Sequence, residues 1–205
     1  MKADIYDFDK TVIPFDSGSL FMVYCFVRHP YLIFLLPYYI VVGLLLALQI
    51  INLEKFKRHI FCFVRFINLD KNVKSFWDKY ESKIYDWFRP ENRERTAIVI
   101  SASPDFLLGE IKERMKIDYV LCTRHDRKTG TLLGNNCRFH EKVRRFNEAF
   151  GDKDVEIFNV YSDSTEHDGP IFSLGKRCFH VRSDGRKEEF VYAEKYPNGP
   201  DKFVK

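Results

Sequence analysis

Cysteine is sparse in this sequence and is never clustered. Five cysteines occur in 205 residues, and no two of them stand in a C-x-x-C spacing. This pattern argues against the common zinc sites and against a thiol redox motif. An odd, scattered set is typical of reduced thiols in the cytosol that serve mostly as small core residues. The cysteines are Cys25, Cys62, Cys122, Cys137 and Cys178.

A strong charge bias is also missing. The 33 basic residues exceed the 29 acidic ones by only four, which gives a net charge of +4, and no basic arm is present. We therefore expect no nucleic-acid partner, whereas an anionic substrate or a membrane surface fits this charge. No signal peptide is expected, because the chain opens directly on MKADIYDFDK.

Hydrophobic residues are abundant, at 45%, and the length allows one core with an inserted subdomain. Short apolar runs alternate with helical patterns after residue 90, which predicts an α/β fold with a doubly wound, mainly parallel sheet. RKTGTL and RSDGRK predict hairpin turns. The predicted strands are 3–9, 96–101, 118–123, 155–161 and 177–181, and the predicted helices are 103–115, with Pro104 in its first turn, and 140–151.

Polar residues stand where the predicted strands end. Asp7, Ser101 and Asp163 each end or follow a strand, and Lys142 lies at the start of a helix. An acid after a strand is usually a turn or capping residue when it is taken alone. Ligands of a doubly wound sheet, however, bind outside the carboxyl ends of the strands, so all four side chains should meet at one edge.

This set has the chemistry needed for phosphoryl transfer. Asp7 could attack phosphorus and form an acyl phosphate, and Asp9 could protonate the leaving oxygen and later activate water. Lys142, together with a magnesium ion held by Asp7 and Asp163, could supply positive charge to the transferring oxygens. Two hydroxyl groups could donate hydrogen bonds to phosphate oxygens, those of Thr11 and Ser101.

The sequence resembles the haloacid dehalogenase-like (HAD) phosphatases, and in particular their phosphoserine phosphatase-like members. DFDKT resembles the D-x-D-x-T motif of that family, VISAS its second motif, CRFHEKVRR its third and YSDSTEHD its acidic fourth motif. The motifs occur in the family order. The resemblance implies a Rossmann-like core at 1–16 and 90–205, with an inserted all-helical cap at 17–89.

The resemblance also assigns roles to individual residues. It makes Asp7 the nucleophile and Asp9 the general acid and base. It also makes Asp7, Asp9 and Asp163 the Mg²⁺ ligands, and Asp9 binds through its backbone carbonyl. Many relatives with a YSDS motif have an acid where this chain has His167, and here the acid comes one position later, at Asp168. We therefore expect a supporting role for Asp168, with His167 as the alternative. The remaining assignments are Thr11, Ser101, Ala102 and Lys142 for phosphate binding and Ser164 for support.

One segment of the expected cap carries no charge. Residues 31–51 read YLIFLLPYYIVVGLLLALQII, and a transmembrane helix needs about 20 apolar residues. A single crossing would separate Asp7 from the other motifs, and two crossings would need roughly 40 apolar residues. Three placements stay open: the segment dips into one leaflet as a helical hairpin, lies in the membrane interface, or packs as the core of a soluble cap.

A finer resemblance concerns the substrate. The proline-broken apolar run, the later WF pair, SASPDFL and RCFHVRSDGR are similar to the phosphatidylglycerophosphatase C branch, whose members dephosphorylate a lipid phosphate at the inner face of the bacterial membrane. This resemblance implies a peripheral or re-entrant protein on the cytoplasmic side of the inner membrane. Two other functions remain open: a cytoplasmic phosphatase for a soluble, phosphoserine-like metabolite, and a membrane-bound binding protein without activity.

Overall fold

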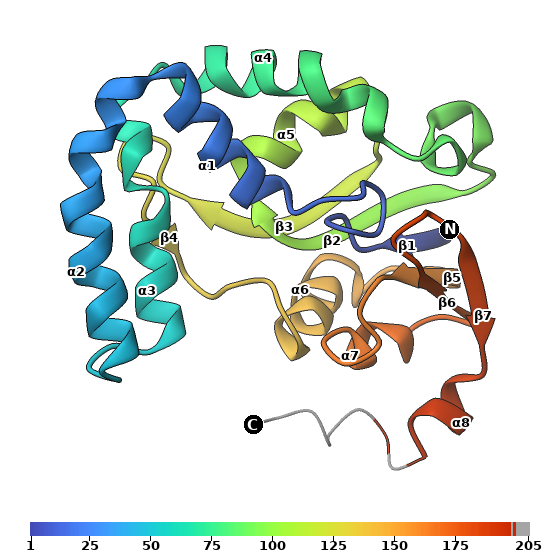
Figure 1. Cartoon of the computed structure of the whole chain (residues 1–205). Coiled ribbons are helices and arrows are strands. Elements are labelled where there is room, and N and C mark those ends of the chain that lie inside the picture. Colours follow the sequence, from blue (N-terminus) through green and yellow to red (C-terminus); the bar gives the residue numbers. More distant parts are fainter. Residues whose placement is uncertain (198, 200–205) are drawn as a thin grey trace.

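A seven-stranded sheet forms the centre of the structure, a computed structural model that describes residues 1–197 and 199 (Figure 1). Its strands are β1 Lys2–Tyr6, β2 Thr96–Pro104, β3 Tyr119–His125, β4 Leu132–Leu133, β5 Glu156–Ser162, β6 Arg177–Val181 and β7 Lys187–Phe190. The strand order is β4-β3-β2-β1-β5-β6-β7. The five central strands are parallel, and β4 and β7 are antiparallel edges. The predicted α/β fold with a mainly parallel sheet is confirmed.

Both predicted hairpin turns are present at the edges of the sheet. The chain turns between β3 and β4 and again between β6 and β7, and each pair is antiparallel. Gly130 in the first turn has a φ of +70°, and a Cβ at this position would lie 1.9 Å from the Phe61 backbone oxygen. Only glycine fits there, because both the backbone conformation and the close approach exclude a side chain.

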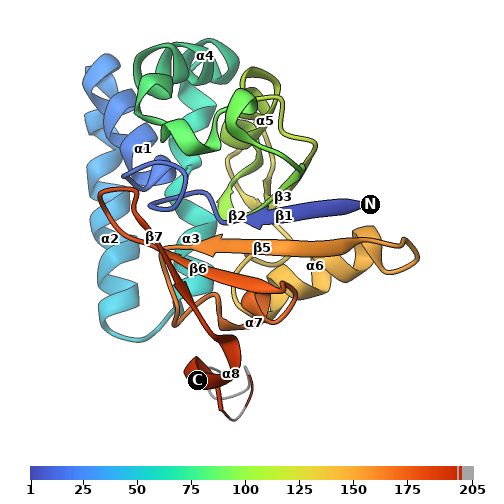
Figure 2. The same ribbon diagram turned by 90° about the vertical axis from the view of Figure 1, so that its right-hand side faces the viewer.

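Helices cover both faces of the sheet (Figures 1 and 2). Helices α6 His140–Phe150 and α7 Gly169–Phe172 lie on one face, and α1 Ser17–Arg28, α4 Leu69–Tyr80 and α5 Asp105–Arg114 lie on the other. The sequence of β2 explains this burial, because its successive apolar residues point to opposite faces. Ala97 and Val99 belong to one hydrophobic core, and Ile98 and Ile100 belong to the other. Pro104, predicted in the first turn of α5, instead ends β2 directly before that helix.

Between β1 and β2 the regular elements are all helical. The remaining ones are η1 Pro30–Leu35, α2 Leu36–Ala47, α3 Leu53–Ile60, η2 Cys62–Phe66, η3 Glu81–Lys83, η4 Asp86–Phe88 and η5 Pro90–Asn92, and a last helix, α8, spans Tyr192–Lys195. Phe21 of α1 and Trp77 of α4 pack in the same core as Phe8 and Phe106. The Trp77 indole also donates a 2.9 Å hydrogen bond to the Leu107 carbonyl. Helices α1 and α4 are therefore a layer of the core itself.

The division into a core at 1–16 and 90–205 and a cap at 17–89 stays a prediction. Residues 198 and 200–205 of the predicted core lie outside the described residues.

Helices α2 and α3 form a hairpin that stands beyond the carboxyl ends of the strands (Figure 1). The segment Pro30–Ala47 has a mean hydropathy of 2.1, and 11% of it is buried. By length and composition alone it could cross a membrane. Leu32 and Val42 are its buried large side chains. Packing as the core of a soluble cap, one of the three expected placements, therefore does not describe this segment.

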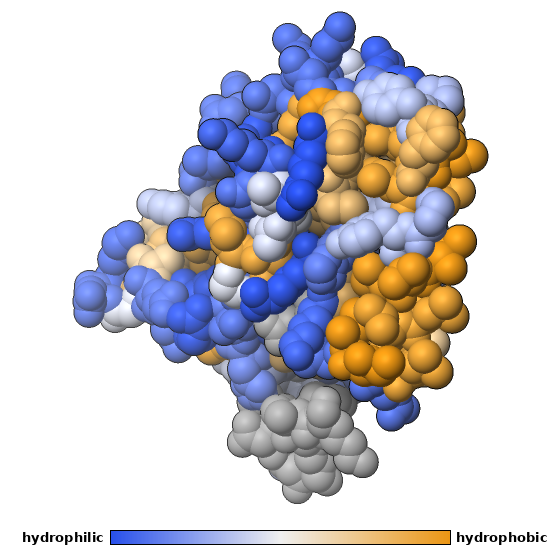
Figure 3. All heavy atoms as spheres, turned by 90° about the vertical axis from the view of Figure 1, so that its left-hand side faces the viewer, coloured by the Kyte–Doolittle hydropathy of each residue, from blue (hydrophilic) through white to orange (hydrophobic). Residues whose placement is uncertain are grey.

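The exposed side chains of this region form a surface that we call the apolar patch. It extends from α1 over η1 and α2 to the turn before α3, and Figure 3 shows apolar residues gathered over a broad area on this side of the molecule. Its large hydrophobic residues are Val23, Val27, Tyr31, Ile33, Phe34, Leu36, Tyr38, Ile40, Val41, Leu44, Leu48 and Ile50.

Candidate active site

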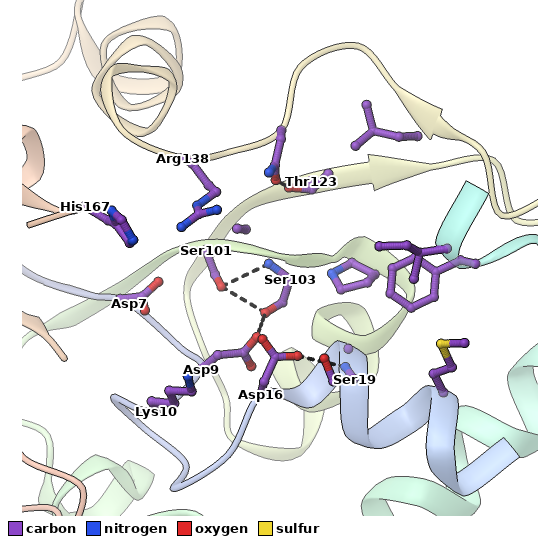
Figure 4. Close-up of a pocket in the computed structure, with 18 of the residues that line it drawn as sticks. Asp7, Asp9, Lys10, Asp16, Ser19, Ser101, Ser103, Thr123, Arg138 and His167 are labelled. Carbon is purple, nitrogen blue, oxygen red and sulfur yellow. Dashed lines mark hydrogen bonds between the residues drawn. The ribbon is translucent and has the colours of Figure 1, made fainter. Parts of the chain in front are cut away.

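A pocket of about 660 Å³ lies at the carboxyl ends of the parallel strands (Figure 4). The loop after β1, the end of β2, the start of α6 and the loop after β5 all contribute to its lining. These are the segments that carry the four sequence motifs. The expectation that the motifs meet at one edge of the sheet is therefore met by the geometry.

Asp7 and Lys142 are in direct contact in this pocket. Asp7 is the first residue after β1, and Lys142 is the third residue of α6. The Lys142 Nζ donates to Asp7 Oδ1 at 2.8 Å and lies 2.7 Å from Asp168 Oδ1. Burial raises the pKa of Asp7 to about 7, although the Lys142 charge acts in the opposite direction. Burial lowers the pKa of Lys142, but the charges of Asp168 and Asp7 outweigh it and leave that pKa raised, so the lysine is a fixed cation.

Asp9 is held in place by two donors on different elements. The Ser17 backbone N–H, at the start of α1, donates to Asp9 Oδ1 at 3.0 Å, and the Ser103 hydroxyl donates to Asp9 Oδ2 at 2.6 Å. Burial, followed by the charge of Asp16, raises the pKa of Asp9 to about 6. Asp9 therefore gains and loses a proton closer to neutral pH than an ordinary aspartate, and its carboxyl group has a fixed orientation.

Asp163 follows β5 and is held by Thr11. The Asp163 backbone N–H donates to Thr11 Oγ1 at 2.8 Å, and that hydroxyl lies 3.3 Å from Asp163 Oδ1 and 3.5 Å from Asp7 Oδ2. Burial and the charge of Asp168 raise the pKa of Asp163. Thr11 was expected to bind phosphate, but its side chain is fully buried and does not line the pocket. In this structure Thr11 positions the two carboxylates.

Ser101 and Ala102 line the pocket, as expected for phosphate-binding residues. The pairing of β2 with β3 shifts register between Ser101 and Pro104, which brings consecutive residues of β2 to the pocket. The Ser101 hydroxyl donates to Ser103 Oγ at 3.1 Å, so it belongs to the same hydrogen-bonded chain as Asp9 (Figure 4).

The two alternatives for the fourth motif have different surroundings. Asp168 is buried, and in addition to Lys142 it accepts a 2.6 Å hydrogen bond from the Ser162 hydroxyl. His167 lines the pocket, and its Nδ1 is buried without a hydrogen-bond partner in the described part of the chain. Ser164 accepts from the His167 backbone N–H at 3.0 Å. The geometry thus gives Asp168 the supporting position and directs His167 to the pocket.

Asp7, Asp163 and the backbone carbonyl of Asp9 form a hard oxygen donor set of the kind that Mg²⁺ prefers. Within residues 1–197 and 199, no three His, Cys, Asp or Glu side chains are grouped as a metal site. A cation here would therefore depend on the carbonyl as well as the two carboxylates. Asp7 and Asp168 both pair with Lys142, and Asp163 lies near enough for the charge of Asp168 to raise its pKa. This concentration of negative charge fits a divalent ion.

The outer wall of the pocket is apolar. It is made by side chains of α1 and of the α2–α3 hairpin, among them Val23, Tyr39 and Ile60. Val23 also belongs to the apolar patch, where it is 58% exposed. The wall of the pocket is therefore continuous with that patch.

Sequence reasoning missed three residues of the site. Ser17 and Ser103 orient Asp9, and Arg138 lines the pocket. Ser103 follows Ser101 by two positions in SASP, and that spacing was the available signal for it. Ser17 holds Asp9 through its backbone N–H, and its hydroxyl donates to Ser103 Oγ at 3.4 Å. The backbone contact leaves no signal in residue type.

Comparisons with known proteins agree with this geometry. The family model of the haloacid dehalogenase-like hydrolases matches residues 5–173. Protein CicA of Caulobacter vibrioides (strain NA1000 / CB15N) is 34% identical over 73 residues, a match covering 33% of this chain and 32% of that protein. The match therefore spans about a third of that relative's length.

Two solved structures are similar in fold. A protein with unknown function from Bordetella pertussis Tohama I has a TM-score of 0.59 and 14% identity, and the match covers 77% of this chain and 81% of that one. Phosphoserine phosphatase in its apo form has a TM-score of 0.50 and 15% identity, with coverage of 86% and 84%. At these identities the likeness concerns the fold alone.

Proposed function

Because the chain belongs to the haloacid dehalogenase-like hydrolase family, we propose that it is a Mg²⁺-dependent phosphomonoester hydrolase with Asp7 as its nucleophile. One observation carries this proposal. Asp7 contacts the buried cation Lys142 at 2.8 Å in a pocket that also contains Asp9, held by two hydrogen bonds. A nucleophile, a fixed positive charge and an oriented acid are the groups that phosphoryl transfer requires.

In the first half of the reaction, a carboxylate oxygen of Asp7 attacks phosphorus. An acyl phosphate bond forms as the bond between phosphorus and the ester oxygen breaks. Asp9 donates its proton to that departing oxygen, which leaves as an alcohol. Lys142 stabilises the charge on the transferring oxygens, and the Ser101 hydroxyl contributes when it turns from Ser103 Oγ to the phosphoryl group.

In the second half, Asp9 is a carboxylate and accepts a proton from water as the water oxygen attacks phosphorus. The bond between phosphorus and Asp7 breaks, inorganic phosphate leaves, and both residues return to their starting states. Ser17 and Ser103 keep the Asp9 carboxyl group in one orientation through both proton transfers.

Mg²⁺ would be held by the side chains of Asp7 and Asp163 and the carbonyl of Asp9, and it would supply positive charge to the transferring phosphoryl oxygens. Thr11 supports this site, because its hydroxyl bridges the two carboxylates.

We propose a lipid phosphate such as phosphatidylglycerophosphate as the substrate. The pocket has a polar floor at Asp7 and an apolar wall at Val23 and Tyr39, and this wall continues into the apolar patch. A phosphorylated head group fits the floor, and acyl chains fit the wall and the surface beyond it. A continuous patch of large apolar side chains on one side of a protein is typical of contact with a membrane or a partner protein.

The same patch supports a place at the membrane. The α2–α3 hairpin would enter one leaflet, or lie in the interface, and hold the pocket over the lipid head groups on the cytoplasmic side of the inner membrane. The hairpin is joined to α1 at one end and to α4 at the other, and both of these helices pack in the core of the sheet, so the motifs stay on one side of the bilayer.

Phosphate release tests this function directly. Purified protein is assayed with Mg²⁺ on a soluble aryl phosphate, on phosphoserine, and on phosphatidylglycerophosphate in vesicles. We expect hydrolysis of the aryl phosphate and a kcat/KM that is highest for the lipid in vesicles. A preference for phosphoserine by a protein that does not bind vesicles would contradict the lipid substrate and leave the phosphatase activity standing.

A further inference from the structure

Arg138 brings a positive charge to the pocket that the catalytic steps above do not use. It lies in the loop before α6 and lines the pocket, and Figure 4 shows its side chain directed into the space above Asp7. No carboxylate among residues 1–197 and 199 pairs with it, whereas Lys142 in the same pocket contacts both Asp7 and Asp168. A half-buried guanidinium without an acidic partner is available to an anion from outside the protein.

The backbone around Arg138 fixes the direction of its side chain. Its N–H donates to the Asn136 carbonyl at 2.8 Å, and its own carbonyl accepts from the Glu141 N–H at 3.0 Å. The next residue, Phe139, has a φ of +50°, which is costly for a residue with a side chain. Because the backbone turns at Phe139, the chain at Arg138 runs in a different direction from the helix that begins at His140.

The Phe139 ring contacts two pocket residues. The Arg138 guanidinium lies 5.4 Å from the ring centroid, and the His167 ring packs edge-on at 5.1 Å. The His167 Nδ1 has no hydrogen-bond partner in the described chain although it is buried. An orphaned polar atom of this kind needs an explanation, and a bound ligand supplies one. Figure 4 shows His167 and Arg138 directed toward the same space.

From these contacts we propose that Arg138, supported by His167, binds a second anionic group of the substrate, distinct from the phosphoryl group that is transferred. This inference rests on the proposed phosphatase function. Lys142, and not Arg138, is the cation in contact with the nucleophile, so the two cations can hold two different anions. The guanidinium fork matches a phosphate or a carboxylate with paired hydrogen bonds. The substrate class is thus a phosphomonoester that carries a further phosphodiester or carboxylate.

The second anion could belong to a lipid head group or to a water-soluble compound, and four substrates separate these sources. Phosphatidylglycerophosphate in vesicles and its deacylated, soluble counterpart both carry a phosphodiester beside the phosphomonoester. Phosphatidic acid in vesicles and an aryl phosphate carry the phosphomonoester alone. For each pair, the kcat/KM of the substrate that carries the second anion is divided by the kcat/KM of the substrate that lacks it. This gives one ratio for the lipids and another for the soluble compounds.

Arg138→Gln removes the charge and keeps a polar side chain of similar reach. We expect it to lower the ratio by about 10- to 100-fold, as for the loss of a charge-assisted hydrogen bond. Arg124→Gln is the matched control, because Arg124 is exposed on β3 and does not line the pocket, and it should leave the ratio unchanged. A loss in the lipid pair alone would identify the lipid as the source of the second anion. A loss in the soluble pair would extend recognition to the soluble phosphodiester.

An equal fall on all four substrates, or an unchanged ratio, would overturn the proposal. Binding is measured separately by calorimetry, with the deacylated phosphodiester as the probe and the protein in its Asp7→Asn form, so that no turnover is needed. Arg138→Gln should weaken this binding, and unchanged binding would contradict the role of Arg138 even if the protein were no phosphatase. Absence of hydrolysis by the wild type, with Arg138-dependent binding, would reject the proposed function alone.

Discussion

The Ser103 hydroxyl donates a 2.6 Å hydrogen bond to Asp9 Oδ2 and itself accepts from Ser101 and Ser17 at 3.1 and 3.4 Å. It is thus the last member of a buried chain of hydroxyl groups that ends on the proposed general acid and base. Ser103→Ala should lower kcat by about 10- to 100-fold with little change in KM, because a hydrogen bond to a charged group contributes about 1.5–3 kcal/mol.

Steady-state kinetics on an aryl phosphate measure this effect. Ser103→Thr restores the hydroxyl group and should recover most of kcat, which separates orientation of Asp9 from packing. Equal kcat values for wild type and Ser103→Ala would show that Asp9 does not depend on this contact.

Removal of Asp163 should weaken Mg²⁺ binding, whereas removal of Asp168 should lower the stability of the fold. Asp163→Ala removes an expected Mg²⁺ ligand and should raise the half-saturating Mg²⁺ concentration by at least about 10-fold. Asp168→Ala removes a buried partner of Lys142 and should cost about 3 kcal/mol of unfolding free energy, or about 6–12 °C in Tm. Magnesium titration of activity and thermal unfolding give the two values.

Chelator should abolish activity in the wild type, and added Mg²⁺ should restore it. Full activity in excess chelator would refute the metal requirement. A larger rise in the Mg²⁺ requirement for Asp168→Ala than for Asp163→Ala would reverse the roles assigned to the two acids.

Neighbouring residues of α2 allow the apolar patch to be tested without damage to the fold. Leu44 is 56% exposed, whereas Val42 is 5% exposed. Leu44→Lys should leave Tm nearly unchanged but cost about 2.5–3.5 kcal/mol of membrane partitioning if the site lies deep in the bilayer. Val42→Lys should destabilise the fold, because it buries an unpaired charge. Vesicle co-sedimentation and thermal unfolding are the two measurements.

Val191→Lys is the matched control for Leu44→Lys. Val191 is 57% exposed but lies between β7 and α8, outside the apolar patch. Its substitution should affect neither vesicle binding nor stability. Wild-type protein that remains in the supernatant with vesicles, as a detergent-free monomer, would contradict the proposed membrane contact.

The mainly parallel sheet and the meeting of Asp7, Ser101, Lys142 and Asp163 were predictable, because the carboxyl ends of parallel strands lie at one edge of a sheet. The alternation of apolar segments and helical patterns fixed which residues stand at those ends. Each of these inferences needs only local pattern and one topological rule. The order of the strands was not predicted.

The contacts of Ser103 and Thr11 were not predictable in the same way. The two-residue spacing places Ser103 on the same side of β2 as Ser101. Its partner Asp9 lies in the loop after β1, and no local pattern shows that this loop brings Asp9 to Ser103. Thr11 faces Asp163 and not the pocket, and this depends on how the loop after β1 closes.

The surroundings of the apolar segment also required the structure. A helix that is apolar on every side gives no periodic signal, so the sequence could not separate buried Val42 from exposed Val41. The packing of α1 and α4 in the core of the sheet depends on contacts distant in sequence, such as Phe21 with Phe106.

The most direct test of the account is to find the phosphoryl group on Asp7 during turnover. Wild-type protein with Mg²⁺ and an aryl phosphate is quenched in acid, and mass spectrometry locates the modified peptide. The account predicts a phosphoryl group on Asp7, none in the Asp7→Asn variant, and a fall in kcat of at least about 10³-fold for that variant, or roughly 4 kcal/mol. A phosphoryl group on another residue, or an Asp7→Asn variant that keeps a large part of its turnover, would contradict it.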